Sequence, residues 1–342
     1  MSAHTGLRGY ASVLGHGPAV RPFLAAVIAR LPVGMAGLGM IVLIQQVRGN
    51  YSVAGVVTAA FALATAVSAP FWGRAMDRAG QPKVLVGTGV ASPAALAALA
   101  LAAVGGAGNL ALILLAALTG LLFPPISPAM RAAWRVIFPD AQRRNLGYAL
   151  DASAVELIFV CGPLLLSLLA AFLPPEAPLL VTAVLMAVGS VAYSSTTAAR
   201  SWRSADLVVL DEGASRGAVG RNTASTALTA PGLAVLLVVA LCMAVGFGQM
   251  DTAFVATAEA VLGSADKLGF LFAAIAGGST IGGLLYGSRS WAGDEFKRTA
   301  LMLALFALTL VPLPILMLTG TTSLWVILPL MFLTGLTIAP TL

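Results

Sequence analysis

The chain has very few charged residues and almost no histidine or cysteine. Only 9% of its 342 residues are Asp, Glu, Lys or Arg, whereas 59% are hydrophobic. A soluble domain carries about 25% charged residues, and a soluble chain needs far more polar residues than this one has to cover its apolar surface. The composition therefore excludes a soluble enzyme or binding domain, and the high hydrophobicity also excludes an intrinsically disordered chain.

The shortage of histidine and cysteine excludes several kinds of chemistry. Both histidines, His4 and His16, precede the first long apolar run, so neither metal binding nor Ser–His catalysis has ligands at membrane depth. Cys161 and Cys242 lie in separate apolar runs without metal-ligand spacing, and we interpret them as packing residues. The phosphate-binding pattern G-x-x-x-x-G-K-[ST] does not occur, so the chain itself does not use ATP. We expect no enzyme, cofactor or metal site.

Long apolar runs are what the chain has in abundance. A membrane-spanning helix needs about 20 mostly apolar residues. Ten such runs occupy 23–44, 52–72, 84–104, 109–130, 149–172, 178–197, 231–257, 266–287, 299–318 and 323–342. The runs are continuous rather than alternating, which favours helices over barrel strands. The sequence therefore predicts an all-α, multi-pass protein of the lipid bilayer.

The positive charges are distributed unevenly between these runs. Lys and Arg number 19 against 13 Asp and Glu, and most of the 19 fall in the N-terminal segment or in the loops after every second run. Only Arg48 and Lys267 fall in the alternate loops, and Arg30 lies inside the first run. The positive-inside rule then places the N-terminus in the cytoplasm, in a plasma or bacterial inner membrane. The net charge of +6 thus reflects topology and does not indicate nucleic-acid binding.

An internal repeat divides the ten runs into two parts. T-G-L-L-F-P-P at 119–125 is repeated as T-G-L-T-I-A-P at 334–340, and F-W-G-R at 71–74 resembles L-Y-G-S-R at 285–289. Both pairs give nearly the same period, which equals six helices plus a linker. We expect an N-terminal six-helix bundle over 1–197, a cytoplasmic linker over 198–230 and a C-terminal bundle over 231–342. About ten of twelve helices would then be present, in a C-terminally incomplete chain; the alternative is a genuine ten-helix protein.

The segment after the second run carries a recognisable motif. G-R-A-M-D-R-A-G-Q-P-K-V-L at 73–85 resembles the loop 2–3 signature of the major facilitator superfamily, matching it at Gly73, Asp77, Arg78 and Gly80. P-P-I-S-P-A-M-R at 124–131 and the Arg-rich loop after it are similar to bacterial efflux-type members of that superfamily. The resemblance implies a 6+6 helical bundle that works as a secondary transporter.

The motif has a physical rationale as a conformational latch. Gly73 would allow close approach of a neighbouring helix, and Asp77 could accept hydrogen bonds from a helix N-terminus or pair with an arginine. Arg78 is equally well explained as a topology determinant. The expected latch therefore comprises Gly73, Asp77, Arg78 and Gly80.

Charged residues inside the apolar runs are costly, by at least about 2.5–3.5 kcal/mol each near a helix centre, and often functional. Arg30, Glu156 and Asp251, with Gln249 beside the last, are the candidates for proton coupling or substrate contact. We expect Arg30 to pair with Glu156 or Asp251 in one state, unless Arg30 snorkels to the interface. Asp151 is expected to be interfacial.

Gly162 and Pro163 resemble part of an antiporter signature, whose trailing glycines are missing, and predict a helix kink. Taken together, the residues and the resemblance favour proton-coupled efflux of a small organic solute by alternating access. The alternatives are a remnant that does not transport, or a permease component of another complex.

Overall fold

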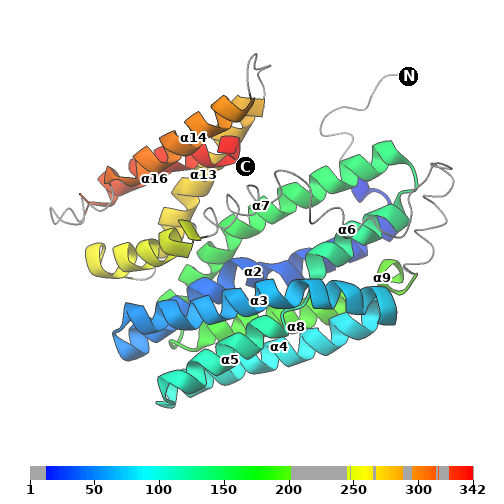
Figure 1. Cartoon of the computed structure of the whole chain (residues 1–342), viewed down its shortest axis with the longest axis horizontal. Helices are drawn as coiled ribbons and strands as arrows, with labels where there is room; N and C mark the ends of the chain where they lie inside the picture. Colours follow the sequence, from blue (N-terminus) through cyan, green and yellow to red (C-terminus); the bar gives the residue numbers. More distant parts are fainter. Residues whose placement is uncertain are drawn as a thin grey trace.

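The fold is helical throughout the part of the chain that the structure describes. It is a computed structural model and describes residues 13–201, 245–246, 248–264, 267–287, 295–312, 315 and 323–341, without the side chains of 156, 260–261, 283–287, 295–297, 299 and 339–341. No strand occurs within these ranges (Figure 1). The predicted all-α class is therefore confirmed.

The described helices follow the predicted apolar runs closely. In chain order they are α2 (Gly17–Arg48), α3 (Tyr51–Ala79), α4 (Gln81–Val104), α5 (Asn109–Leu121), α6 (Ile126–Ile137), α7 (Ala141–Phe172), α8 (Ala177–Ser194), α9 (Thr197–Ser201), the π-helical turn η1 (Thr257–Val261), α13 (Leu268–Gly287), α14 (Glu295–Leu310) and α16 (Leu324–Thr341). Residues 248–256 are also helical. Within these ranges six segments are long and apolar enough to cross a membrane, and α13, α14 and α16 contain shorter apolar stretches.

The fourth predicted run is two helices rather than one. The expected span 109–130 is divided into α5 and α6 by a break at 122–125, which ends in Pro124 and Pro125. Proline lacks the backbone N–H that an α-helix requires, and it disfavours helical geometry in the residue before it. The break allows α6 to take its own direction and to present Arg131 and Arg135 on its exposed face, opposite the buried Trp134.

A tight turn joins α3 to α4. Gly80 is the only residue between the two helices, its φ is +84°, and its N–H donates to the carbonyl oxygen of Met76 at 2.9 Å. A positive φ of this size is accessible to glycine at little cost and is strained for other residues. This turn lies at the same end of the helices as the last residues of α6 and the first residues of α7. We call that end the arginine-rich end, because it carries Arg74, Arg78, Arg131, Arg135, Arg143 and Arg144. The opposite end is where α2 ends and α3 begins.

Helix α2 packs against α8, α7, α3 and α6. Glycine makes two of these crossings close: a Cβ on Gly189 of α8 would overlap the backbone of Ala29, and a Cβ on Gly162 of α7 would lie 3.2 Å from the Cα of Gly34. Small residues permit such close approach between helices in membranes. Helix α2 is thereby fixed in depth and rotation against both α7 and α8.

Of the helices that follow residue 245, α13 packs against α7. Helix α13 also contacts α16, and α14 contacts α16 (Figure 1). Gly278 and Gly282 of α13 lie directly against the backbone of α16. The expected linker 198–230 overlaps α9 at its start, and its remainder from 202 lies outside the described residues. The division into two bundles therefore stays a prediction.

Candidate functional site

A buried ion pair connects α2 to α7. The Nη2 atom of Arg30 donates to Oδ1 of Asp151 at 2.7 Å, and only 3% and 6% of the two side chains is exposed. The remaining Nε and Nη1 atoms of Arg30 are buried without a hydrogen-bond partner. Breaking such a pair by removing one partner leaves an uncompensated charge in a low-dielectric interior. The pair thus places a carboxylate and an incompletely satisfied guanidinium inside the helical assembly.

In this conformation the partner of Arg30 is Asp151 rather than Glu156 or Asp251, and Asp151 is buried between helices. The reason is tertiary, because the crossing of α2 and α7 at Gly34 and Gly162 decides which residues of α7 face Arg30. A pairing of Arg30 with Glu156 or Asp251 in another state, and the interfacial depth of Asp151, stay predictions. Glu156 lies about one and a half turns further along α7, and its side chain lies outside the described part of the structure.

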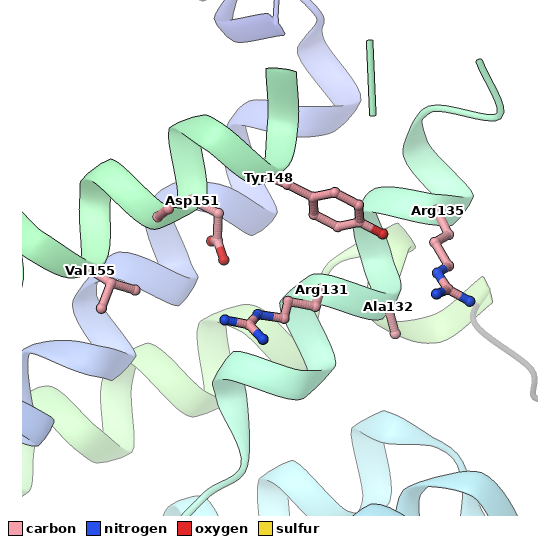
Figure 2. A pocket seen from close by; sticks show the side chains of 7 residues that line it. Arg131, Ala132, Arg135, Tyr148, Asp151 and Val155 are labelled. Atoms are coloured by element: carbon pink, nitrogen blue, oxygen red, sulfur yellow. The ribbon is translucent and has the colours of Figure 1, made fainter. Parts of the chain in front are cut away.

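A pocket of about 650 Å³ lies between α6 and α7 next to this ion pair. Figure 2 shows Arg131 extending from α6 toward the side of Asp151, and Tyr148 extending from α7 toward α6. The pocket is lined by Arg131, Ala132 and Arg135 of α6 and by Tyr148, Asp151, Ala152 and Val155 of α7. Its volume is within the range of small-molecule sites, about 300–1,000 Å³. Sequence reasoning missed this pocket, although the spacing of Arg131 and Arg135 placed them on one helix face.

Asp251 and Gln249 lie in the helical residues 248–256. Asp251 is half-buried and Gln249 is exposed, and no ion pair of Asp251 occurs within the described ranges. This segment is held against α13 by Phe254 and Phe272, whose ring centroids are 5.1 Å apart in an edge-to-face arrangement. The structure therefore does not bring Asp251 to Arg30, and its role in coupling stays a prediction.

The motif residues Gly73, Asp77 and Arg78 lie in the last turns of α3, and Gly80 follows it; the four differ in how they contribute to packing. A Cβ on Gly73 would meet no atom within 4 Å, so the close helix contact expected there is absent from this conformation. The close crossing of α3 is at Phe61 instead, where Gly120 of α5 lies against its carbonyl group. Asp77 and Arg78 are exposed and form no ion pair among the described residues. Gly80 makes the turn into α4 described above.

Gln81, the first residue of α4, is almost completely buried. Its Nε2 donates to the carbonyl oxygen of Ala129 on α6 at 3.2 Å, and its Oε1 accepts from the hydroxyl of Tyr193 on α8 at 3.3 Å. One side chain therefore connects α4, α6 and α8 at the arginine-rich end, and helps to fix α6 where it lines the pocket.

Gly162 and Pro163 lie inside α7, which continues to Phe172. Pro163 cannot donate a helical hydrogen bond, and Gly162 gives α7 its close contact with Gly34 of α2. The pair is therefore placed at the helix crossing that sets the register between Arg30 and Asp151.

Two hydrogen bonds join the early helices to the later ones near the opposite end. The hydroxyl of Tyr51, the first residue of α3, donates to Oε2 of Glu259 in η1 at 3.0 Å. The backbone N–H of Gly269 in α13 donates to Oγ of Ser167 in α7 at 3.1 Å. Glu259 follows the predicted seventh run, and nothing local in the sequence indicates its partner 208 residues away.

The comparison with protein families now identifies the chain. The sequence model of the family described as the Major Facilitator Superfamily matches residues 22–342 of the chain. The chain belongs to the Major Facilitator Superfamily. The resemblance seen in the motif at 73–85 is thereby confirmed at the level of the superfamily.

Solved structures of peptide transporters also match this superfamily member. Peptide transporter POT in complex with sulfate is 16% identical with a TM-score of 0.43, and a mutant of POT in complex with alafosfalin is 15% identical with the same TM-score. Each alignment covers 88% of this chain and 60% of the other, so the chain spans about three fifths of the length of these transporters. A comparison with curated protein sequences gave no significant match.

Proposed function

We propose that this member of the Major Facilitator Superfamily acts in secondary active transport, moving a small organic solute out of the cell in exchange for protons. The observation that carries the proposal is the ion pair of Arg30 and Asp151, buried between two helices that are long and apolar enough to cross a membrane. Ionisable groups at membrane depth are costly and mark substrate or proton pathways. An ordinary packing role would be filled at lower cost by apolar residues.

The ion pair offers a simple means of coupling. Protonation of Asp151 removes its negative charge, and with it the attraction that holds the carboxyl group to Arg30. Uptake of a proton by Asp151 then releases Arg30 from the ion pair. Alternating access requires two events to be linked in this way. Glu156 and Asp251, with Gln249 nearby, are proposed as further groups on the proton or solute path.

Alternating access is supported by where the early and late helices meet. The Tyr51–Glu259 and Gly269–Ser167 hydrogen bonds lie near the opposite end, whereas the pocket lies toward the arginine-rich end. We assign the arginine-rich end to the cytoplasm, so that the pocket between α6 and α7 lies toward the cytoplasmic side. The bundles 1–197 and 231–342 would then rock about the linker, with Gly73, Asp77, Arg78 and Gly80 as the latch between states.

The test of coupling is transport by the purified protein in proteoliposomes, screening small organic solutes with and without a pH gradient. We expect a gradient to drive solute movement in the wild type, and Asp151→Asn to abolish the dependence on the gradient. Glu156→Gln and Asp251→Asn report whether those carboxylates share the pathway. Glu176→Gln, at the start of α8, is the control and should keep the dependence. Transport in Asp151→Asn that still follows the gradient would contradict the coupling proposal.

The proposed orientation has its own test. In a variant with Cys161 and Cys242 replaced by alanine, a single cysteine is placed at Asp77 or at Ser52, both of which are exposed. A membrane-impermeant maleimide applied to intact cells should label the cysteine at 52 and not that at 77. The reverse pattern would overturn the assignment of the arginine-rich end to the cytoplasm.

A further inference from the structure

The pocket between α6 and α7 carries positive charge that nothing in its wall neutralises. Arg131 and Arg135 are exposed and line the pocket without an ion-pair partner among the described residues. The single acid in the lining is Asp151, and its charge is already paired with Arg30. Since two arginines line one cavity without an ion-pair partner among the described residues, the electrostatic potential there favours an anion.

The donors in the pocket suit an oxyanion in particular. A guanidinium group is planar and binds a carboxylate or phosphate through two parallel hydrogen bonds. Arg131 and Arg135 are one helical turn apart on α6. Figure 2 shows the hydroxyl of Tyr148 extending from α7 toward the part of α6 that carries Arg135, and the Arg131 side chain extending toward the side of Asp151. The remaining wall is apolar, formed by Ala132, Ala152 and Val155. The lining thus combines anion donors with a surface for a hydrocarbon or aromatic group.

The position of the arginines follows from the fold of α6. Ile126, Met130 and Trp134 are buried on one face of this short helix, so Arg131 and Arg135 must occupy the other. Arg143 lies in the same charged region but is not part of the pocket lining. If Arg131 and Arg135 served only to set the topology, positive charge anywhere near this membrane surface would be enough. That role does not require two arginines to line a cavity beside a buried ion pair.

From this arrangement we infer that the pocket binds a small organic anion through a carboxylate or phosphate group, with Arg131, Arg135 and Tyr148 as ligands. The inference deepens the proposed function, because it names the solute class that enters beside the Arg30–Asp151 pair. The same chemistry occurs in two sources, a soluble organic anion and the headgroup of an anionic lipid.

Binding is measured by calorimetric titration of the protein in nanodiscs of zwitterionic lipid. The probes are phenyl phosphate and benzoate, with benzyl alcohol as the uncharged counterpart. We expect the two anions to bind and the alcohol not to bind. Replacing both arginines, as R131Q/R135Q, should weaken anion binding by about tenfold or more, because charge-assisted hydrogen bonds are lost.

Two further variants separate binding from topology. R131K/R135K keeps the positive charge that topology needs and loses the planar fork, so binding should weaken severalfold while insertion is unchanged. R21Q/R143Q removes two exposed charges outside the pocket and should bind the anions as the wild type does. Equal binding of benzyl alcohol, no anion binding by the wild type, or unchanged anion binding by R131Q/R135Q would overturn the inference.

A repeat of the titration with phosphatidylglycerol in the nanodiscs distinguishes the two sources. A lipid headgroup in the pocket should lower the apparent affinity for phenyl phosphate, and native mass spectrometry should show the lipid retained by the wild type and lost from R131Q/R135Q. Unchanged affinity assigns the site to a soluble anion. Binding is measured without transport, so the two proposals can fail separately. Anion binding without gradient-driven transport contradicts the proposed function alone. Gradient-driven transport without anion binding contradicts the inference about the pocket alone.

Discussion

Arg30 and Asp151 lie 121 positions apart in the sequence, and their side chains meet at 2.7 Å with almost no exposure to solvent. Neither residue is adjacent to a local partner of opposite charge, so the pair exists only where α2 crosses α7. The first prediction concerns its energy. Arg30→Gln should lower the stability of the protein by about 3–5 kcal/mol, because Asp151 is left as an unpaired buried charge.

The double variant R30Q/D151N should regain much of that loss, since it removes both charges. The measurement is the midpoint of thermal unfolding in detergent for the two single variants and the double variant. Arg21→Gln, on an exposed position of the same helix, is the matched control and should leave the midpoint close to that of the wild type. Additive losses in the double variant would show that the two side chains are not energetically coupled.

The second prediction concerns the glycine that sets the depth of α2. Gly189→Ala should destabilise the protein, because the new Cβ overlaps the backbone of Ala29 next to Arg30. Gly87→Ala is the control, since a Cβ there meets no atom within 4 Å. In a helix interior that substitution should gain about 0.5–1 kcal/mol. Opposite shifts in unfolding midpoint are therefore expected, and a stabilising effect of Gly189→Ala would contradict the close crossing.

The third prediction concerns Gln81 and the position of α6. Gln81→Leu should destabilise the protein by about 1–3 kcal/mol, because the carbonyl of Ala129 and the hydroxyl of Tyr193 lose their partner. It should also weaken anion binding by displacing Arg131 and Arg135 of α6. Lys83→Gln, two positions away and exposed, should change neither quantity. Both effects are read by thermal unfolding and by titration with phenyl phosphate.

The fourth prediction concerns the contact between Tyr51 and Glu259. Burial raises the pKa of the Glu259 carboxyl, and the hydrogen bond from Tyr51 acts in the smaller, opposite direction. Because the net shift is upward, the conformation that buries Glu259 is most favourable at low pH and loses stability as the pH rises through the raised pKa, even though the hydrogen bond alone favours the ionised carboxylate. Spin labels on α3 and α13 should therefore report wider separation at high pH.

Glu259→Gln keeps an acceptor for Tyr51 and cannot ionise, so the separation should stay small at every pH. Tyr51→Phe removes the hydrogen bond, and should widen the separation even at low pH. A pH response that persists unchanged in Glu259→Gln would assign the effect to another group.

The course of the helices was largely predictable because the signals for it are local. Continuous apolar runs identify membrane helices without reference to any other part of the chain. Gly80 is also a local signal, for the turn into α4, although we interpreted it only as part of the latch, and the sidedness indicated by the positive charges stays a prediction. The division of the fourth run was not predicted, although Pro124 and Pro125 stand in the sequence, because its hydropathy continues across them. The superfamily motif at 73–85 was equally visible as a local pattern.

The candidate site, unlike the helices, was mostly not predictable from local patterns in the sequence. That Arg30 is an unusual residue follows from the sequence, because charge at membrane depth is costly wherever it occurs. That its partner is Asp151, and that Arg131, Arg135 and Tyr148 line a pocket beside the pair, follows only from the tertiary structure. Each of these contacts depends on how helices far apart in the chain cross and rotate, and that is set by side-chain and glycine packing between them rather than by any local pattern.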